Sequence, residues 1–528
     1  MSGFRQSQSS LHTWSGLIVG WVLFTIFLMG TVSYWRADLN RWMRPELSGP
    51  SQPEQAVAGA QAYLRRTAPD ARSWFISVPG AREIGAQLFW QPQPMEGEAR
   101  PRRRRDTQAL VDADGQPLHA RDTRGGEFFY RFHFDLHYVP VIWARWFVGF
   151  CAMAMLVAII SGVITHKKIF KDFFTFRRGK GQRTWLDGHN ATAVLALPFH
   201  LMITYTGLVT LMTLYMPWAA VANYEQTDKL FDALFPSAGE VARTGAPAPL
   251  VNLVPLMRDA SARWGGAAVG TVRVAEPGDA AARVTISASQ ASGISARAPS
   301  ISYSGTTGRM IWQSHGADGA AEAAGVMIGL HAGRYAPDLL RWLYFLSGMG
   351  GTVMVASGLV LWTVKRREKL PDPDHPHFGF RLVERLNIGF IAGLPLAMTG
   401  YLWANRLLPT DIQGRAEWEI HAMFLAWGAA LLVGFLRPVR RAWVELFALT
   451  GAAMIALPFH DLSNSRGLLQ SGAMGDMRMV AMNLTICALG ATFLMMARKV
   501  RRYQPRQKRS ARKVATLPNA QAILEPAE

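Results

Sequence analysis

Eight long apolar segments constrain the fold of this chain more than any other feature. Each is close to the roughly 20 residues that an α-helix needs to cross a bilayer. They lie at approximately 14–35, 139–165, 187–214, 338–364, 386–405, 419–436, 442–460 and 480–497. The first has no charged residue and no small-residue cleavage site, which indicates a retained span rather than a signal peptide. The sequence therefore predicts a polytopic α-helical membrane protein with about eight transmembrane helices.

The placement of the basic residues predicts how these spans are oriented. A formal net charge of +19 could suggest a nucleic-acid partner. Lysine and arginine are instead concentrated in every second connection and in the tail after the last span. This is the positive-inside pattern, so we expect both termini in the cytoplasm, contact with membrane lipid and no nucleic acid. The two cysteines both lie in apolar spans, so neither a disulfide framework nor a cysteine metal site is expected.

Two long connections are predicted to face away from the cytoplasm, at about 36–136 and 215–330. Each begins with a helical pattern and continues with about three short β-rich runs and a hairpin-like turn. We expect two small α+β domains, one inserted between the first and second spans and one between the third and fourth.

The spans on either side of these regions also repeat. His12 lies 18 residues before Gly30, and His189 lies 18 residues before Gly207. The pair Arg145-Trp146 is likewise matched by Arg341-Trp342. The first 365 residues therefore read as a tandem duplication, followed by an appended bundle of four spans. The expected divisions are 1–35, 36–136, 137–214, 215–330, 331–365, 366–498 and a basic cytoplasmic tail at 499–528.

Histidines near both ends of the spans are the candidate functional residues. Such a histidine is either a structural residue bonded to a neighbouring helix or a functional one, since intramembrane ionisable groups are costly. His189 and His200 are eleven residues apart, which places them on one face of a continuous helix. Neutral imidazole ligates iron well, and an apolar bundle suits porphyrins that need only axial ligands. Zinc would need three or four convergent ligands. We therefore expect two b-type haems (haem b), each with two histidine ligands.

The duplication suggests how the histidines pair. It would bring His137 together with His331 near the external surface, and His189 together with His166 or His12 near the cytoplasmic surface. His200 either replaces an external ligand or supports one. Arg145 and Arg341 are expected to contact haem propionates or lipid headgroups. Interface or packing roles are expected for His133, His421 and His460.

At this point the sequence resembles a known family. The His-first spans, the duplicated external region and the stretches "SGVITHKKIFKDFFTFRRGKG", "LDGHNATAVLALPF" and "ASGLVLWTVKRREK" are similar to PepSY-associated transmembrane proteins, over about residues 10–367. These are iron-regulated inner-membrane proteins that include dihaem ferric-siderophore reductases. The resemblance implies PepSY domains in the periplasm of a Gram-negative bacterium.

Taken together, the sequence favours an electron conduit that reduces a ferric-siderophore in the periplasm and so releases iron, without a catalytic acid or base. The internal connections leave no room for a flavin or nicotinamide domain, so the electron donor is expected to be membrane quinol or a separate reductase. The alternatives are a periplasmic sensor or protease regulator without redox activity, and a siderophore or iron permease.

Overall fold

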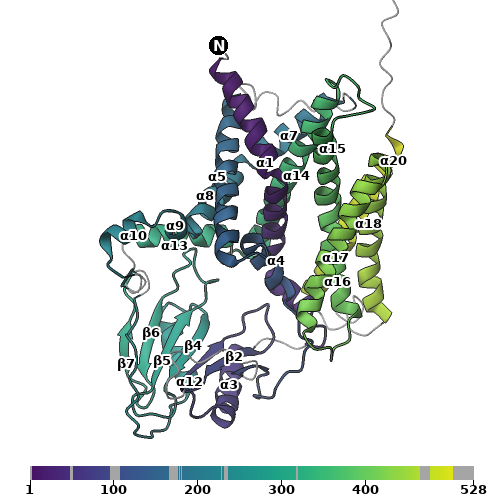
Figure 1. Cartoon of the computed structure of the whole chain (residues 1–528). Helices are drawn as coiled ribbons and strands as arrows, with labels where there is room; N and C mark the ends of the chain where they lie inside the picture. Colours follow the sequence, from purple (N-terminus) through teal and green to yellow (C-terminus); the bar gives the residue numbers. More distant parts are fainter. Residues whose placement is uncertain are drawn as a thin grey trace, which may run out of the picture.

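The computed structural model describes residues 3–47, 52–94, 107–165, 177, 179, 181–226, 229–230, 236–316, 319–463 and 476–503. A helical bundle carries a β-sheet at one end, and the N-terminus lies at the opposite end (Figure 1). We call these the sheet end and the far end of the bundle.

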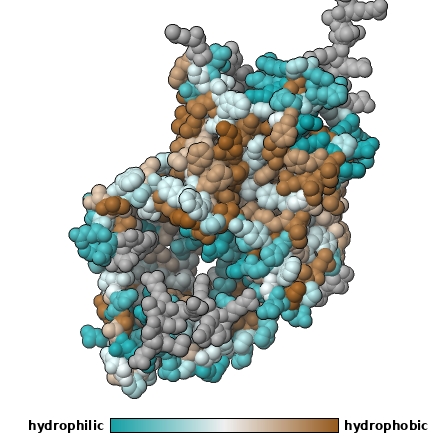
Figure 2. All heavy atoms as spheres, viewed as in Figure 1, coloured by the Kyte–Doolittle hydropathy of each residue, from teal (hydrophilic) through white to brown (hydrophobic). Residues whose placement is uncertain are grey.

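Seven described helical segments are long and apolar enough to cross a membrane. They are α1 (Phe4–Ser33), α5 (Val141–Thr165), α14 (Asp338–Arg367), the continuous run of α15 (Phe378–Asn387), η2 (Ile388–Ala392) and α16 (Gly393–Leu407), α17 (Arg415–Leu436), α18 (Val439–Ser463) and α20 (Met477–Arg502). Large apolar side chains such as Trp143, Phe150 and Ile160 of α5 are exposed, and apolar residues dominate the bundle surface in Figure 2. The prediction of a polytopic helical membrane protein is confirmed.

The remaining expected span is broken in two. Helix α7 (Gln182–Leu195) and helix α8 (Leu197–Thr210) meet at an angle of 67°. Pro198 lies in the first turn of α8, where its missing N–H and its ring prevent a straight continuation of α7. His189 and His200 therefore do not share one face of a continuous helix, contrary to the prediction from their spacing.

Five shorter helices lie around the sheet end of the bundle: α2 (Arg36–Trp42), α4 (Gly125–Asp135), α9 (Met212–Tyr215), α10 (Trp218–Asn223) and α13 (Gly319–Ala332). Helix α4 contacts α1 and α2, whereas α13 contacts α8. Since α4 and α13 each precede the second span of a repeat, they occupy corresponding places in the two halves.

The two external regions build one antiparallel sheet. The first supplies β1 (Ser73–Ser77), β2 (Ala86–Gln91) and β3 (Gln108–Val111), and the second supplies β4 (Val269–Ala275), β5 (Arg283–Ala288), β6 (Ser300–Ser304) and β7 (Met310–Gln313). The strand order is β3-β2-β1-β4-β5-β6-β7. Helices α3 (Pro53–Thr67) and α12 (Leu253–Arg263) pack on it around one shared core.

This arrangement differs from the two separate domains that the sequence suggests. Strand β1 pairs with β4, with Trp74 opposite Val274 and Ile76 opposite Val272, and all four side chains are buried. Pairing the two halves removes two exposed strand edges, which would otherwise be templates for aggregation. The duplicated regions therefore complete each other rather than fold side by side.

The appended bundle packs directly against the duplicated part. Phe129 of α4 lies in one apolar cluster with Tyr401 of α16 and Met423 of α17. The Tyr401 hydroxyl donates to the carbonyl oxygen of Gly125, the first residue of α4, at 3.0 Å. The Thr123 hydroxyl donates to the buried Glu419 carboxylate. The appended helices therefore fix where α4 begins.

Candidate functional site

Two pairs of histidines lie at opposite ends of the duplicated bundle. At the far end, the rings of His12 on α1 and His189 on α7 have their centroids 6.3 Å apart. At the sheet end, the rings of His133 on α4 and His331 on α13 have their centroids 6.0 Å apart. We call these the far pair and the sheet-end pair. His133 contacts α1 at Ile26, so about 14 helical positions, or roughly 21 Å, separate the two levels.

All four imidazoles are held in the same way. In each, the ring Nδ1 donates to a backbone carbonyl oxygen of a neighbouring helix. The bonds are His12 to Ala158 (2.8 Å), His189 to Met354 (2.9 Å), His133 to Ile26 (2.7 Å) and His331 to Ile203 (3.0 Å). A carbonyl oxygen only accepts, so Nδ1 must carry the proton and Nε2 must keep its lone pair. That tautomer is the one in which Nε2 is the metal-ligating nitrogen.

A glycine follows each accepting carbonyl by four residues, one helical turn further on. These glycines are Gly162, Gly358, Gly30 and Gly207. A Cβ atom at these positions would lie 3.1, 3.2, 2.7 and 2.9 Å, respectively, from Cε1 of the histidine ring. The absence of a side chain therefore makes the space that each ring occupies. The sequence shows these glycines as markers of the repeat, and the structure shows that each lies against a histidine ring.

The structure pairs His331 with His133 rather than with His137, which corrects the expected sheet-end pair. Helix α4 ends at Asp135, and Leu136 and Tyr138 have φ angles of 47° and 50°. This turn directs the His137 ring toward Phe424 of α17, with centroids 5.8 Å apart. The sequence predicts a packing role for His133, whereas the structure places its ring beside that of His331.

The sequence could not have decided between these two histidines. The distance in sequence from Gly162 to Gly358 defines the offset between equivalent positions in the two repeats. When this offset is subtracted from His331, the equivalent position falls midway between His133 and His137, two residues from each. The choice of His133 over His137 follows only from the structure, because it depends on which face of α4 contacts α1.

At the far end, the ring that lies beside His189 is that of His12, one of its two expected partners. The other, His166, lies outside the described residues. His200 on α8 is fully buried between Phe27 and Phe199. Within the described part of the chain, the His200 ring does not stack on another histidine. His200 lies about one helical turn before Ile203, and therefore at a depth in the bundle between the far pair and the sheet-end pair.

The two arginines singled out by the repeat have different surroundings. Arg145 Nε donates to the Asp135 carboxylate at 2.8 Å, so its charge is already balanced. Arg341 instead donates to three backbone carbonyl oxygens, those of Tyr34 (3.1 Å), Ala336 (3.0 Å) and Arg334 (3.5 Å).

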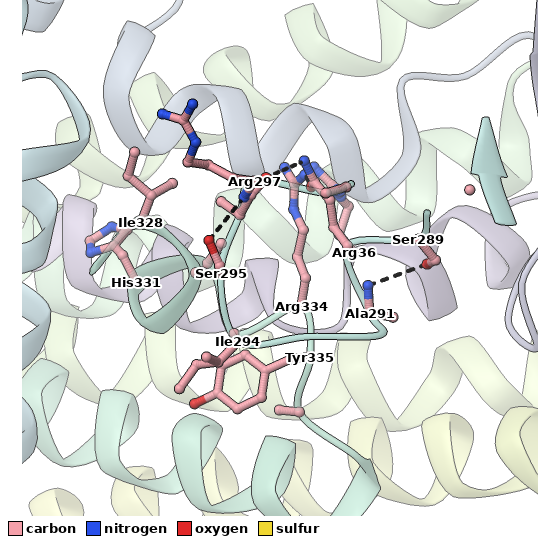
Figure 3. Close-up of a pocket in the computed structure, with 18 of the residues that line it drawn as sticks. Arg36, Ser289, Ala291, Ile294, Ser295, Arg297, Ile328, His331, Arg334 and Tyr335 are labelled. Carbon is pink, nitrogen blue, oxygen red and sulfur yellow. Dashed lines mark hydrogen bonds between the residues drawn. The ribbon is translucent and has the colours of Figure 1, made fainter. Parts of the chain in front are cut away.

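The sheet-end pair opens onto a large cavity between the bundle and the sheet. Its volume is about 2320 Å³, and its lining includes both histidines of the pair. Figure 3 shows His331 there together with Arg36, Arg297 and Arg334. Burial, with a smaller effect of the neighbouring His133, lowers the pKa of His331 to about 4. Both effects keep this imidazole neutral at pH 7, which is the ligating form.

The ring separation in both pairs is compatible with one metal ion between the two imidazoles. A metal–imidazole bond is about 2 Å long, so two imidazoles on one metal ion have centroids roughly 6 Å apart. Both pairs have this separation. In the described residues, three or more histidine, cysteine or acidic side chains do not converge anywhere in a way that could hold a metal ion. Two axial ligands on opposite sides of one metal ion would match the separation of these rings.

Fold and site together define a polytopic helical membrane protein with a duplicated histidine-bearing core and one sheet shared by the two halves. The family model for the PepSY-associated TM region matches residues 9–365. The chain belongs to this family. It is also 27% identical to an uncharacterized protein of Pseudomonas aeruginosa over 331 residues, which are 59% of this chain and 80% of that protein. The family match covers the duplicated part and leaves the appended bundle outside.

Proposed function

We propose that this protein is an inner-membrane haem protein that moves electrons across the membrane to reduce a periplasmic ferric-siderophore. The far pair lies on the cytoplasmic side in this proposal, and the sheet lies in the periplasm. The observation that supports it most strongly is that one arrangement occurs four times: a histidine whose Nδ1 is bonded to a backbone carbonyl oxygen and whose ring lies against a glycine. The four histidines form two pairs, with ring centroids 6.0 and 6.3 Å apart. A packing role alone would not require the same bond and the same glycine at all four histidines.

The chain contributes position and environment rather than acid–base chemistry. The carbonyl oxygens of α1, α5, α8 and α14 fix the tautomer and the orientation of each ring. The glycines let the rings approach these helices. Bound haem supplies reversible one-electron transfer between the two ends.

Reduction releases the iron because Fe(II) is a softer ion that hard-oxygen chelators hold less tightly than Fe(III). One electron reduces each Fe(III), and membrane quinol or a separate reductase is oxidised to supply it. The cavity between sheet and bundle would hold the ferric chelate next to the sheet-end pair.

The test is haem stoichiometry in purified histidine variants, measured as the pyridine haemochrome. Two haems per chain are expected in the wild type, with bis-histidine spectra. His133→Ala and His331→Ala should each lose about one haem, and His12→Ala should lose the other. His137→Ala is the matched control, because its ring lies against Phe424 instead.

A well-folded wild-type protein without haem after haem-replete expression would refute the proposal. It would favour the sensor or permease alternatives, which give the four histidine–glycine contacts no purpose. Loss of haem in His137→Ala but not in His133→Ala would refute the assignment of the sheet-end pair.

A further inference from the structure

The wall of the cavity beside His331 is strongly basic. Eight arginines and four carboxylates line the cavity, and lysine is absent from its described lining. The arginines are Arg36, Arg82, Arg145, Arg258, Arg297, Arg334, Arg341 and Arg478. An excess of fixed cations in a partly enclosed space attracts anions.

Most of this positive charge is balanced inside the protein. Arg36 lies 3.2 Å from the Glu127 carboxylate. The other balanced arginines form ion pairs with acidic residues: Arg145 with Asp135, Arg258 with Glu54, and both Arg82 and Arg478 with Asp338. Arg82 and Arg478 also lie within 4.0 Å of the Asp38 carboxylate, so each of these five arginines already has an acidic partner.

Arg334 and Arg341 differ from these five. In the described residues no carboxylate lies within ion-pair distance of either. Arg334 donates to the side-chain oxygen of Gln290, and Arg341 donates to backbone carbonyl oxygens. The Nε atom of Arg341 is buried and has no hydrogen-bond partner among these residues. A buried donor on an unbalanced cation is costly unless an anion accepts from it.

Both arginines are held close to the sheet-end pair. Arg334 follows His331 by three residues, and Gly333 between them has a φ of 60°, which ends α13 and turns the chain. Arg341 lies in the first turn of α14. Guanidinium groups bind carboxylates through two parallel N–H donors.

The loop between β5 and β6 also lines the cavity and packs on α13. The Ala296 N–H donates to the carbonyl oxygen of Gly325 at 2.9 Å. A side chain at Gly329 would overlap the carbonyl oxygen of Ile294. Figure 3 shows Ile294, Ser295 and Arg297 of this loop around the same space as Arg334. The sheet and the sheet end of the bundle, where we propose a haem, therefore enclose one cavity between them.

We propose that Arg334 and Arg341 bind carboxylate groups, and that these belong to the ferric chelate, so the substrate class is anionic carboxylate-bearing ferric chelates rather than neutral hydroxamate chelates. This inference rests on the proposed function. The cavity, about 2320 Å³, exceeds the 300–1,000 Å³ of an ordinary small-molecule pocket, so a chelate can occupy it beside a porphyrin.

The test measures binding of gallium chelates, because Ga(III) mimics Fe(III) in size and charge but is not reduced. The full-length protein in lipid nanodiscs is titrated with Ga(III)–citrate and with a neutral gallium trishydroxamate by calorimetry. The variants are Arg334→Gln and Arg341→Gln, with Arg334→Lys to retain the charge. Arg258→Gln is the matched control, because this cavity-lining arginine is exposed and already paired with Glu54. Haem content is measured on every sample.

Binding of Ga(III)–citrate should weaken by at least about tenfold in Arg334→Gln and Arg341→Gln, which is the loss expected for one charge-assisted hydrogen bond. Arg334→Lys should recover part of the affinity, and Arg258→Gln should bind like the wild type. The trishydroxamate should bind weakly and equally in all variants. Higher salt should weaken only the citrate complex.

Equal citrate affinity in the wild type and in both glutamine variants would overturn the proposal. So would a glutamine variant that loses haem while its citrate affinity is unchanged, because the carboxylates would then belong to the porphyrin. Because gallium binding needs no electron transfer, arginine-dependent citrate binding by a haem-free protein would refute the proposed function and leave this site standing.

Discussion

Gly30→Ala is the substitution whose effect on the sheet-end pair follows most directly from the structure. A Cβ at Gly30 would lie 2.7 Å from Cε1 and 2.8 Å from Nδ1 of His133. Carbon atoms in contact are about 3.5–4.0 Å apart, so the ring must retreat by roughly 0.8 Å or more. Metal–ligand distances are tolerant to only about 0.2 Å. The displacement is therefore several times larger than a ligand bond can absorb, and we expect Gly30→Ala to lose the haem that we propose at the sheet end.

The same argument predicts a gradient over the four glycines. Gly207→Ala should behave like Gly30→Ala, because its Cβ would lie 2.9 Å from Cε1 of His331. At Gly162 and Gly358 the corresponding distances are 3.1 and 3.2 Å, so a shift of a few tenths of an ångström suffices. We expect these two variants to keep the far haem, with a shifted spectrum or reduction potential.

The assay is the pyridine haemochrome per chain together with dithionite-reduced spectra of the purified variants. Gly16→Ala on α1 is the control, since a Cβ there meets no atom within 4 Å. It should keep both haems and gain a few tenths of a kcal/mol in helix stability, up to about 1. Full haem content with an unchanged spectrum in Gly30→Ala would refute the view that this glycine seats a ligand.

Three further predictions concern other parts of the chain. His200→Leu should keep both proposed haems and should not lower the melting temperature, because it places an apolar group in a fully buried site between Phe27 and Phe199; loss of one haem would restore His200 as a ligand. Glu419→Gln should destabilise the protein by about 3–5 kcal/mol in thermal melts, because it leaves the fully buried Arg415 without its counter-charge, whereas replacing both residues with leucine should cost less; an equal or larger loss in the double variant would contradict this. Desolvation acts to raise the pKa of Asp279, but hydrogen bonds from the Thr244 hydroxyl and the N–H groups of Ala281, Thr244 and Gly245 outweigh it and lower that pKa to about 2. Because the folded-state pKa lies below the unfolded value of about 4, this stabilisation is present above pH 4 and lost toward pH 2. Asp279→Asn should therefore flatten the fall of melting temperature between pH 4 and 2.5, and parallel curves for variant and wild type would contradict the assignment.

The sequence by itself determined the membrane class of this protein, most of its spans and its duplication. Long apolar segments permit few other folds, because a bilayer requires every backbone polar group to be bonded within the segment. Repeated landmarks such as Gly30 with Gly207 and Gly162 with Gly358 are also local in the chain, so they can be found without a structure. The same holds for the choice of histidine as the candidate residue type.

Contacts between distant segments were decided only by the tertiary structure. The pairing of β1 with β4, which merges two expected domains into one sheet, depends on edges that meet across about 200 residues. The choice of His133 over His137 depends on where α4 ends and which of its faces meets α1. The break at Pro198 separates His200 from His189, although their spacing would align them on an unbroken helix. In each case the outcome depends on packing between elements, and the sequence pattern of a single helix or strand carries no information about that packing.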